Sequence, residues 1–143
     1  MIRIDETRNI PLPRADAFAY VADFANVGEW DPGVVSSSQR GDDPPGLGTL
    51  YDVVATFGKS TIPLVYEIEE WAPPERVVLT TSSKRFDAVD TITFVELDDD
   101  RTRVVYVADF ELKGVMRLLA PVVRPMFARL GKKALDGLES QTA

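Results

Sequence analysis

The chain has 143 residues, of which 45% are hydrophobic and 27% are charged, a profile typical of one globular domain. It contains neither cysteine nor histidine, which excludes disulfides, zinc sites built on thiolate or imidazole, and catalysis by Ser-His-Asp or Cys-His groups. The net charge of −7 argues against nucleic acid or an anionic membrane surface as the main partner.

The N-terminal residues MIRIDETRNIP carry several charges and lack the apolar core of a signal peptide. No run elsewhere approaches the roughly 18 apolar residues that a membrane span needs. We therefore expect a cytoplasmic protein with no stable membrane insertion.

The first elements are predicted to be a strand followed by two short helices. Residues 2–10 alternate with period 2, so that Ile2, Ile4 and also Glu6 fall on one face. Apolar residues then recur at helical spacing over 14–24, after two prolines that suit the start of a helix. One or two further helical turns follow, and the sequence Asp31-Pro32-Gly33 ends them.

Six further strands are predicted, because short β-like runs alternate with turn sequences. The runs are 34–40, 48–57, 61–71, 76–83, 86–97 and 102–112. Short connections between consecutive strands indicate antiparallel hairpins. Together with the first strand they form a seven-stranded antiparallel sheet.

From Gly114 onward the apolar period is helical again and predicts a long amphipathic helix to about residue 140. Pro121 and Pro125 predict either a kink or a helix that properly begins near Pro121 after a looser turn. Such a helix must lie against the sheet. We therefore expect one α+β domain over residues 1–143, with the sheet curved around the C-terminal helix.

Several stretches of the sequence carry a resemblance to a known family. They are Asp23-Phe24, Glu29-Trp30-Asp31-Pro32-Gly33, Gly48-Thr49, Pro73-Pro74-Glu75-Arg76-Val77, Asp90-Thr91-Ile92-Thr93-Phe94 and Leu112-Lys113-Gly114. With the order of elements, they resemble the START-like or polyketide cyclase/dehydrase-like (SRPBCC) superfamily over essentially the whole chain. The resemblance implies a helix-grip fold enclosing an apolar cavity for a hydrophobic small molecule, and it supplies no catalytic motif. We expect no cofactor and no metal.

Asp90 is the first candidate for a functional group. It lies in phase with the apolar residues of its strand, and a carboxyl on the inner face needs a partner or a raised pKa. Asp90 is thus interpreted as a general base or a ligand anchor. The alternative is a structural acid that bonds a backbone group, an arginine or the C-terminal helix.

Two tyrosines and a second acid accompany it. Tyr66 and Tyr106 each fall among the apolar positions of their strands, and Glu6 is in phase on the first strand. In the helix-grip order the last strand lies between the first and the sixth, so Tyr106 could lie between Glu6 and Asp90. These side chains are candidates for proton transfer or ligand anchoring. Ordinary core packing is the alternative for each tyrosine.

Trp30 follows the second short helix, where it could act as a lid or a stacking platform at the mouth of the cavity, or as a plug that packs the short helices on the sheet. The remaining candidates for the ligand-binding lining come from the inner faces of the strands and from the helix. They are Ile68, Phe86, Phe94, Phe110, Met116, Leu119, Val123, Met126 and Phe127. For the methionines, plain core filling is the alternative.

Three functions remain open at this stage. The leading one is the binding of a hydrophobic or aromatic, lipid- or polyketide-like molecule. The second is a polyketide cyclase or dehydratase that uses Asp90, Tyr66 or Tyr106. The third is an interaction module, which predicts an exposed apolar patch and a filled core. A homodimer is one possible assembly.

Overall fold

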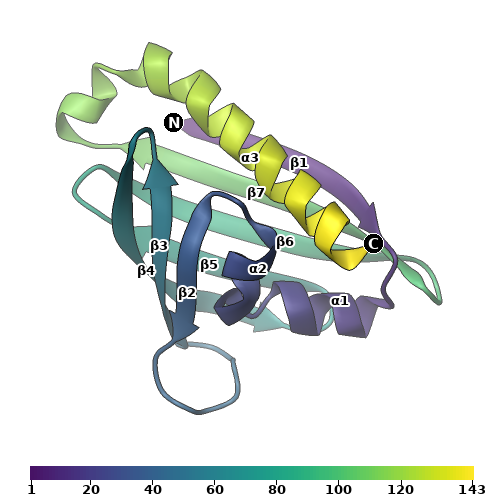
Figure 1. Ribbon diagram of the computed structural model, residues 1–143. Helices are drawn as coiled ribbons and strands as arrows, with labels where there is room; N and C mark the ends of the chain where they lie inside the picture. The colour runs from purple at the N-terminus through teal and green to yellow at the C-terminus, as the bar shows by residue number, and fades with distance from the viewer.

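The computed structural model describes residues 1–143 and shows a strongly curved antiparallel sheet with one long helix lying across its concave side (Figure 1). The strands are β1 (Ile2–Ile10), β2 (Val34–Gln39), β3 (Leu50–Phe57), β4 (Ser60–Ala72), β5 (Arg76–Ser82), β6 (Phe86–Asp98) and β7 (Arg101–Leu112). The helices are α1 (Arg14–Val21), the 3₁₀ turn η1 (Phe24–Asn26), α2 (Val27–Trp30), the 3₁₀ turn η2 (Gly114–Arg117) and α3 (Ala120–Thr142).

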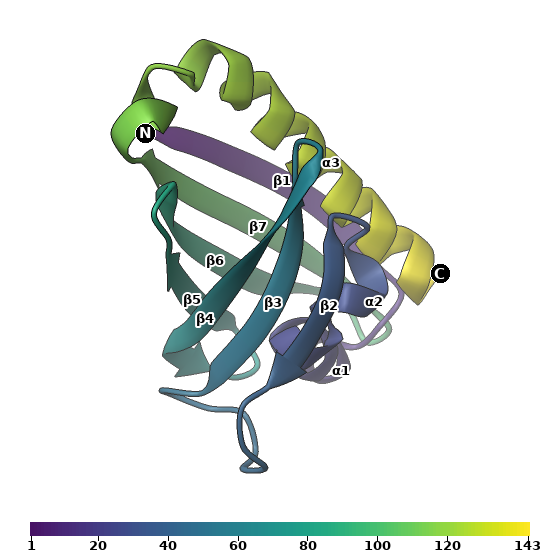
Figure 2. The ribbon, with the colours of Figure 1, turned by 60° about the vertical axis from the view of Figure 1, so that its left-hand side comes forward.

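The strand order is β1-β7-β6-β5-β4-β3-β2, so β7 lies between β1 and β6 as expected. Every neighbouring pair is antiparallel. The register shifts between Ile68 and Glu70 on β4 and between Glu96 and Asp98 on β6. Such bulges increase the local twist and bend of a strand. Figure 2 shows the result, in which β2 and β3 curl towards α3.

The C-terminal segment follows the second of the two predicted alternatives. A short 3₁₀ turn comes first and α3 then begins at Ala120, with Pro121 in its first turn. Proline is tolerated there because its missing N–H would have no partner inside the helix. Pro125 lies inside α3. The first helix is shorter than predicted, since α1 ends at Val21 and a separate turn starts after Asp23, whose carboxylate accepts a hydrogen bond from the Ala25 N–H.

Two glycines bring α3 close to its neighbours. A side chain at Gly131 would overlap Ile4 of β1, and one at Gly137 would overlap the carbonyl oxygen of Trp30 at the end of α2. The absent side chains therefore allow the second half of α3 to pack against β1 and α2. The first half of α3 extends over the open side of the sheet (Figure 2).

The core is a cluster of 31 buried hydrophobic residues from the inner face of the sheet, the short helices and α3. Apolar side chains are also exposed at the start of the C-terminal segment. They are Val115, Leu118, Leu119 and Val122. None of the helices is both long and apolar enough to cross a bilayer.

Candidate functional site

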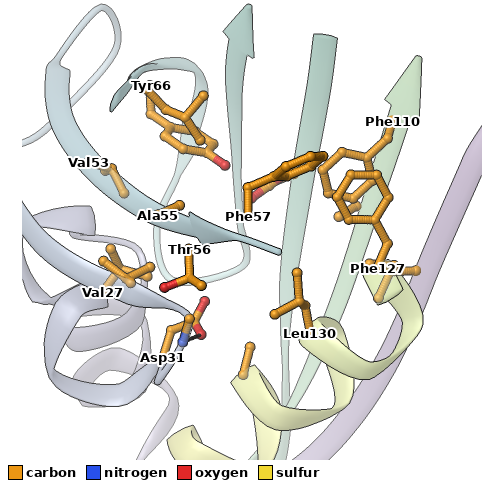
Figure 3. A pocket seen from close by; sticks show the side chains of 18 of the residues that line it. Val27, Asp31, Val53, Ala55, Thr56, Phe57, Tyr66, Phe110, Phe127 and Leu130 are labelled. Carbon is orange, nitrogen blue, oxygen red and sulfur yellow. Dashed lines mark hydrogen bonds between the residues drawn. The ribbon is translucent and has the colours of Figure 1, made fainter. Parts of the chain in front are cut away.

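A cavity of about 120 Å³ lies between the concave face of the sheet, the turn after α2 and the middle of α3. Of its 23 lining residues 18 are hydrophobic. Figure 3 shows Tyr66, Thr56, Asp31 and Leu130 directed towards this space from four different parts of the chain. An engineered apolar cavity of roughly 150 Å³ binds benzene, so the volume suits one ring.

Four phenylalanines close one end of the cavity. Phe57 at the end of β3, Phe86 on β6, Phe110 on β7 and Phe127 on α3 all line it. Phe110 and Phe127 stack with ring centroids 4.4 Å apart, and Phe57 packs on both Phe86 and Phe127. The guanidinium of Arg85 lies 5.2 Å from the centroid of the Phe57 ring. The end of the β3–β4 hairpin is thus held over the cavity by aromatic contacts.

A hydrogen-bonded pair of polar side chains, Asp90 and Tyr106, lies on the sheet floor of the cavity. Asp90 is 3% exposed, and its strand neighbours across the sheet are Leu79 and Ala108, both buried. Tyr106 lies two residues before Ala108 on β7, and its hydroxyl donates a hydrogen bond to Oδ2 of Asp90. The other carboxyl oxygen, Oδ1, has no hydrogen-bond partner.

Burial raises the pKa of Asp90 from 3.8 to about 7. The hydrogen bond from Tyr106 acts in the opposite direction, since it stabilises the carboxylate, whereas the negative charges of Asp31 and Asp109 raise the pKa further. Asp90 therefore exchanges its proton near neutral pH. That behaviour is rare for a carboxyl group and is typical of functional acids and bases.

Asp31 is a second carboxyl group that lines the cavity. The sequence predicts it only as the first residue of the turn that ends the second short helix. It follows α2 directly, and its side chain accepts a hydrogen bond of 2.8 Å from the Gly33 N–H. Burial raises its pKa from 3.8 to about 6, and the Gly33 hydrogen bond partly opposes this. An acidic residue next to Pro-Gly is an ordinary turn signal, so no local pattern distinguishes Asp31 from a surface turn residue.

Tyr66 completes the polar group. Its ring packs edge-on against Phe24, with centroids 5.2 Å apart, and its hydroxyl points into the cavity (Figure 3). The pKa of Tyr66 and that of Tyr106 are raised well above 10 by burial and by the negative charge of Asp90. Both hydroxyls therefore keep their protons at neutral pH and can donate hydrogen bonds.

Glu6 is placed apart from this group. Its carboxylate pairs with the Arg8 guanidinium at 3.1 Å, and Arg8 also pairs with Asp136 of α3 at 2.8 Å. Glu6 does not line the cavity. Although Glu6 lies directly opposite Tyr106 in the register of β1 and β7, the Tyr106 hydroxyl bonds Asp90. Glu6 thus helps to fix α3 against β1.

The other sequence-predicted residues divide between the cavity and its surroundings. Phe86, Phe110 and Phe127 line the cavity together with Tyr66, Asp90 and Tyr106. Trp30 is 2% exposed and packs edge-on against Tyr106, so it is buried and does not lie at an opening. The remaining candidates lie outside the lining. They are Ile68, Phe94, Met116, Leu119, Val123 and Met126.

The helix side of the cavity lies farther along α3 than expected. Leu130, Gly131, Ala134 and Leu135 line it in addition to Phe127. Helical periodicity identifies the buried face of α3 and carries no information on which turns of that face cover a cavity. No group of three or more acidic side chains is arranged to hold a metal ion. The site offers hydroxyl donors and a carboxyl group with an exchangeable proton in apolar surroundings.

Comparison with known proteins places the chain in a family and a fold. The family model for polyketide cyclase/dehydrase and lipid transport matches residues 1–142. An uncharacterised 17.2 kDa protein of Streptomyces lincolnensis is 29% identical over 115 residues, which are 80% of this chain and 73% of that protein.

Several solved structures superpose on nearly the whole length of this chain. A Thermus thermophilus protein of 22% identity superposes with a TM-score of 0.81, covering 98% of this chain and 96% of that one. The Zhui aromatase/cyclase from Streptomyces has 11% identity and a TM-score of 0.77, covering 98% and 90%. A START superfamily protein from Mycobacterium smegmatis has 17% identity and a TM-score of 0.72, covering 97% and 92%. These likenesses confirm the helix-grip fold.

Proposed function

We propose, since the chain belongs to the polyketide cyclase/dehydrase and lipid transport family, that it binds a small ring-containing apolar molecule in the cavity beneath α3. One observation carries the proposal. Asp90 is buried in apolar surroundings with one carboxyl oxygen bonded to Tyr106 and the other without a partner. A buried polar atom left unpaired costs stability, and a ligand hydroxyl or amine could satisfy it.

The volume limits the size of the ligand. Pockets for drug-sized ligands typically enclose roughly 300–1,000 Å³, whereas this cavity has about 120 Å³. One aromatic ring with a polar substituent fits without rearrangement. A larger lipid- or polyketide-like molecule requires the phenylalanines at the end of the cavity to move.

Titration of the ¹⁵N-labelled protein with p-cresol and toluene, followed by amide NMR shifts, tests binding. We expect saturable shifts at residues around the cavity, with p-cresol the tighter ligand because its hydroxyl can bond Asp90. The variant Ala108→Ile places extra carbon beside Asp90 and should abolish both. Val89→Ile, on the outer face of the same strand as Asp90, is the matched control. Absence of saturable shifts with both compounds would refute the proposal.

A second function, a cyclase or dehydratase, is favoured by the pKa of Asp90 of about 7. Ionised Asp90 would take a proton from a carbon between two carbonyl groups. The resulting enolate carbon would attack a third carbonyl farther along the chain, whose oxygen takes a proton from Tyr66 or Tyr106, and the tyrosine would regain a proton from Asp90. Asp90 would then remove the second proton from the attacking carbon, and the new hydroxyl would leave with a proton as water. A synthetic tetraketide thioester, the shortest chain in which a carbon between two carbonyls can close a six-membered ring by this step, tests this reading when its products are followed by mass spectrometry. Unchanged turnover in Asp90→Asn would refute it.

The interaction-module reading has less support. It predicts an exposed apolar patch, and Val115, Leu118, Leu119 and Val122 are exposed within one short segment, but it also predicts a filled core. The cavity beneath α3 does not fit that second expectation. The cytoplasmic location and the homodimer stay predictions, which cell fractionation and light scattering can test.

A further inference from the structure

The ionisable side chains that line the cavity include carboxyl groups but no cations. Asp31 and Asp90 line it, and no lysine or arginine does. Every ionisable group that faces Asp90 is acidic or phenolic: Tyr106 from β7, Tyr66 from β4 and Asp31 from the turn after α2, with Asp109 acting from the outer face of β7. The residues of α3 that line the cavity, Leu130, Ala134 and Leu135 among them, are uncharged.

We propose that this cavity takes a small apolar molecule bearing a protonated amine and rejects the corresponding carboxylate. The inference rests on the proposed binding function and adds the charge class of the ligand. An ammonium group near Asp90 could donate a hydrogen bond to the unpartnered Oδ1, and Asp31 lies close enough to act on Asp90 electrostatically. Two tyrosines are among the aromatic residues that line the cavity, and the faces of aromatic rings attract cations.

An anion meets the opposite conditions in the same place. It loses its hydration shell on entering apolar surroundings and finds no cationic side chain there to compensate. It also meets two carboxyl groups, so either they bind protons or like charges repel. A neutral alcohol avoids these costs and can donate a hydrogen bond to Asp90, but it lacks the added attraction between opposite charges. The expected order of affinity is therefore amine, alcohol, carboxylate.

Three ligands of equal size test this order: benzylamine, benzyl alcohol and benzoate, titrated into the ¹⁵N-labelled protein at pH 7.5. We expect benzylamine to bind at least about tenfold more tightly than benzyl alcohol, because its positive charge adds electrostatic attraction to a hydrogen bond that both ligands can donate to Asp90. Benzoate should give no saturable shifts. Between pH 6 and pH 8 the affinity for benzylamine should rise about tenfold, because a proton on Asp90, with its pKa of about 7, competes with the ammonium group.

Single substitutions distinguish binding of benzylamine in the cavity from non-specific attraction of a cation to a negatively charged protein. Asp90→Asn and, independently, Asp31→Asn should each weaken benzylamine binding by about tenfold or more and affect benzyl alcohol much less. Asp87→Asn removes a carboxylate from the outer face of the same strand as Asp90, where it pairs with Lys113, and should change neither affinity.

The outcomes distinguish the two proposals. If benzyl alcohol binds but benzylamine binds no better, or if benzoate binds as well as benzylamine, the charge selection is wrong and the binding function stands. If none of the three compounds binds, both proposals fail. Equal loss of benzylamine affinity in Asp87→Asn and Asp90→Asn would also overturn the charge selection, because the cation would then respond to overall charge.

Discussion

Replacing Asp90 by asparagine should make the protein more stable, and the gain should depend on pH. The asparagine side chain keeps an oxygen that can accept the hydrogen bond from Tyr106, but it has no proton to lose. In the native chain the Asp90 carboxyl is 3% exposed, and its ionised form is therefore strongly disfavoured. The variant removes the cost of ionising a group that folding has buried.

The magnitude follows from the pKa of Asp90. Folding raises it from 3.8 to about 7, so the folded protein holds this proton more tightly than the unfolded chain does. The stabilisation linked to this proton is complete at acidic pH and is lost as the pH rises from about 4 to about 7. Full loss corresponds to about 4 kcal/mol, of which about 2–3 kcal/mol falls between pH 5 and pH 8.

Urea unfolding followed by tryptophan fluorescence at pH 5, 6, 7 and 8 measures this effect. Between pH 5 and pH 8, the unfolding free energy of Asp90→Asn should increase by about 2–3 kcal/mol relative to that of the native chain. Asp52→Asn is the control, because Arg40 lowers the pKa of Asp52 and its contribution is already complete above pH 5. A constant difference for Asp90→Asn across the range would refute the reasoning from burial.

Two further changes test the packing and the electrostatics. Gly137→Ala should destabilise the fold by about 1–3 kcal/mol in urea unfolding, because the methyl group would overlap the carbonyl oxygen of Trp30, although alanine normally stabilises a helix interior. Gly46→Ala, in a loop with open space, should have little effect, and a stabilised Gly137→Ala would contradict the packing. Tyr106→Phe should raise the pKa of Asp90 above 7, as measured by ¹³C NMR of its carboxyl group, because the hydrogen bond that lowers this pKa is lost. A lower or unchanged pKa would count against that bond.

The sheet and the long helix could be predicted from the sequence because their periodicities extend over many residues. The runs that became β6 and β7 alternate clearly enough to place Asp90 and Tyr106 on the inner face, where the structure has them. The exact first and last residues of the strands were harder to predict. The third strand begins at Leu50 and not at residue 48, where Gly48 has a positive φ of 84° that a regular strand does not contain.

The residues of the candidate site could be predicted from the sequence only where they lie on strands or helices. Asp31 lies in a turn, and turns have no period that reveals which side chain is buried. Asp31 is partly buried, and it lines the cavity together with residues distant in sequence, such as Leu130 on α3. The position of the cavity along α3 likewise depends on where Gly131 and Gly137 allow close approach, which requires knowledge of the neighbours they meet.

The size of the cavity bears on the choice between a binding protein and a cyclase. A chain that must fold into a ring needs room for several carbonyl groups at once, whereas about 120 Å³ holds one ring. The obstacle to a larger volume is the aromatic cluster in which Phe57 contacts Phe86 and Phe127. Phe57 ends β3 next to the turn at Gly58, and its cluster partners lie on other elements, so displacing one hairpin end would enlarge the cavity without disturbing Asp90. The proposed binding of a small ring-containing molecule requires no such displacement, so the cavity as it stands accommodates that proposal more readily than the cyclase reaction.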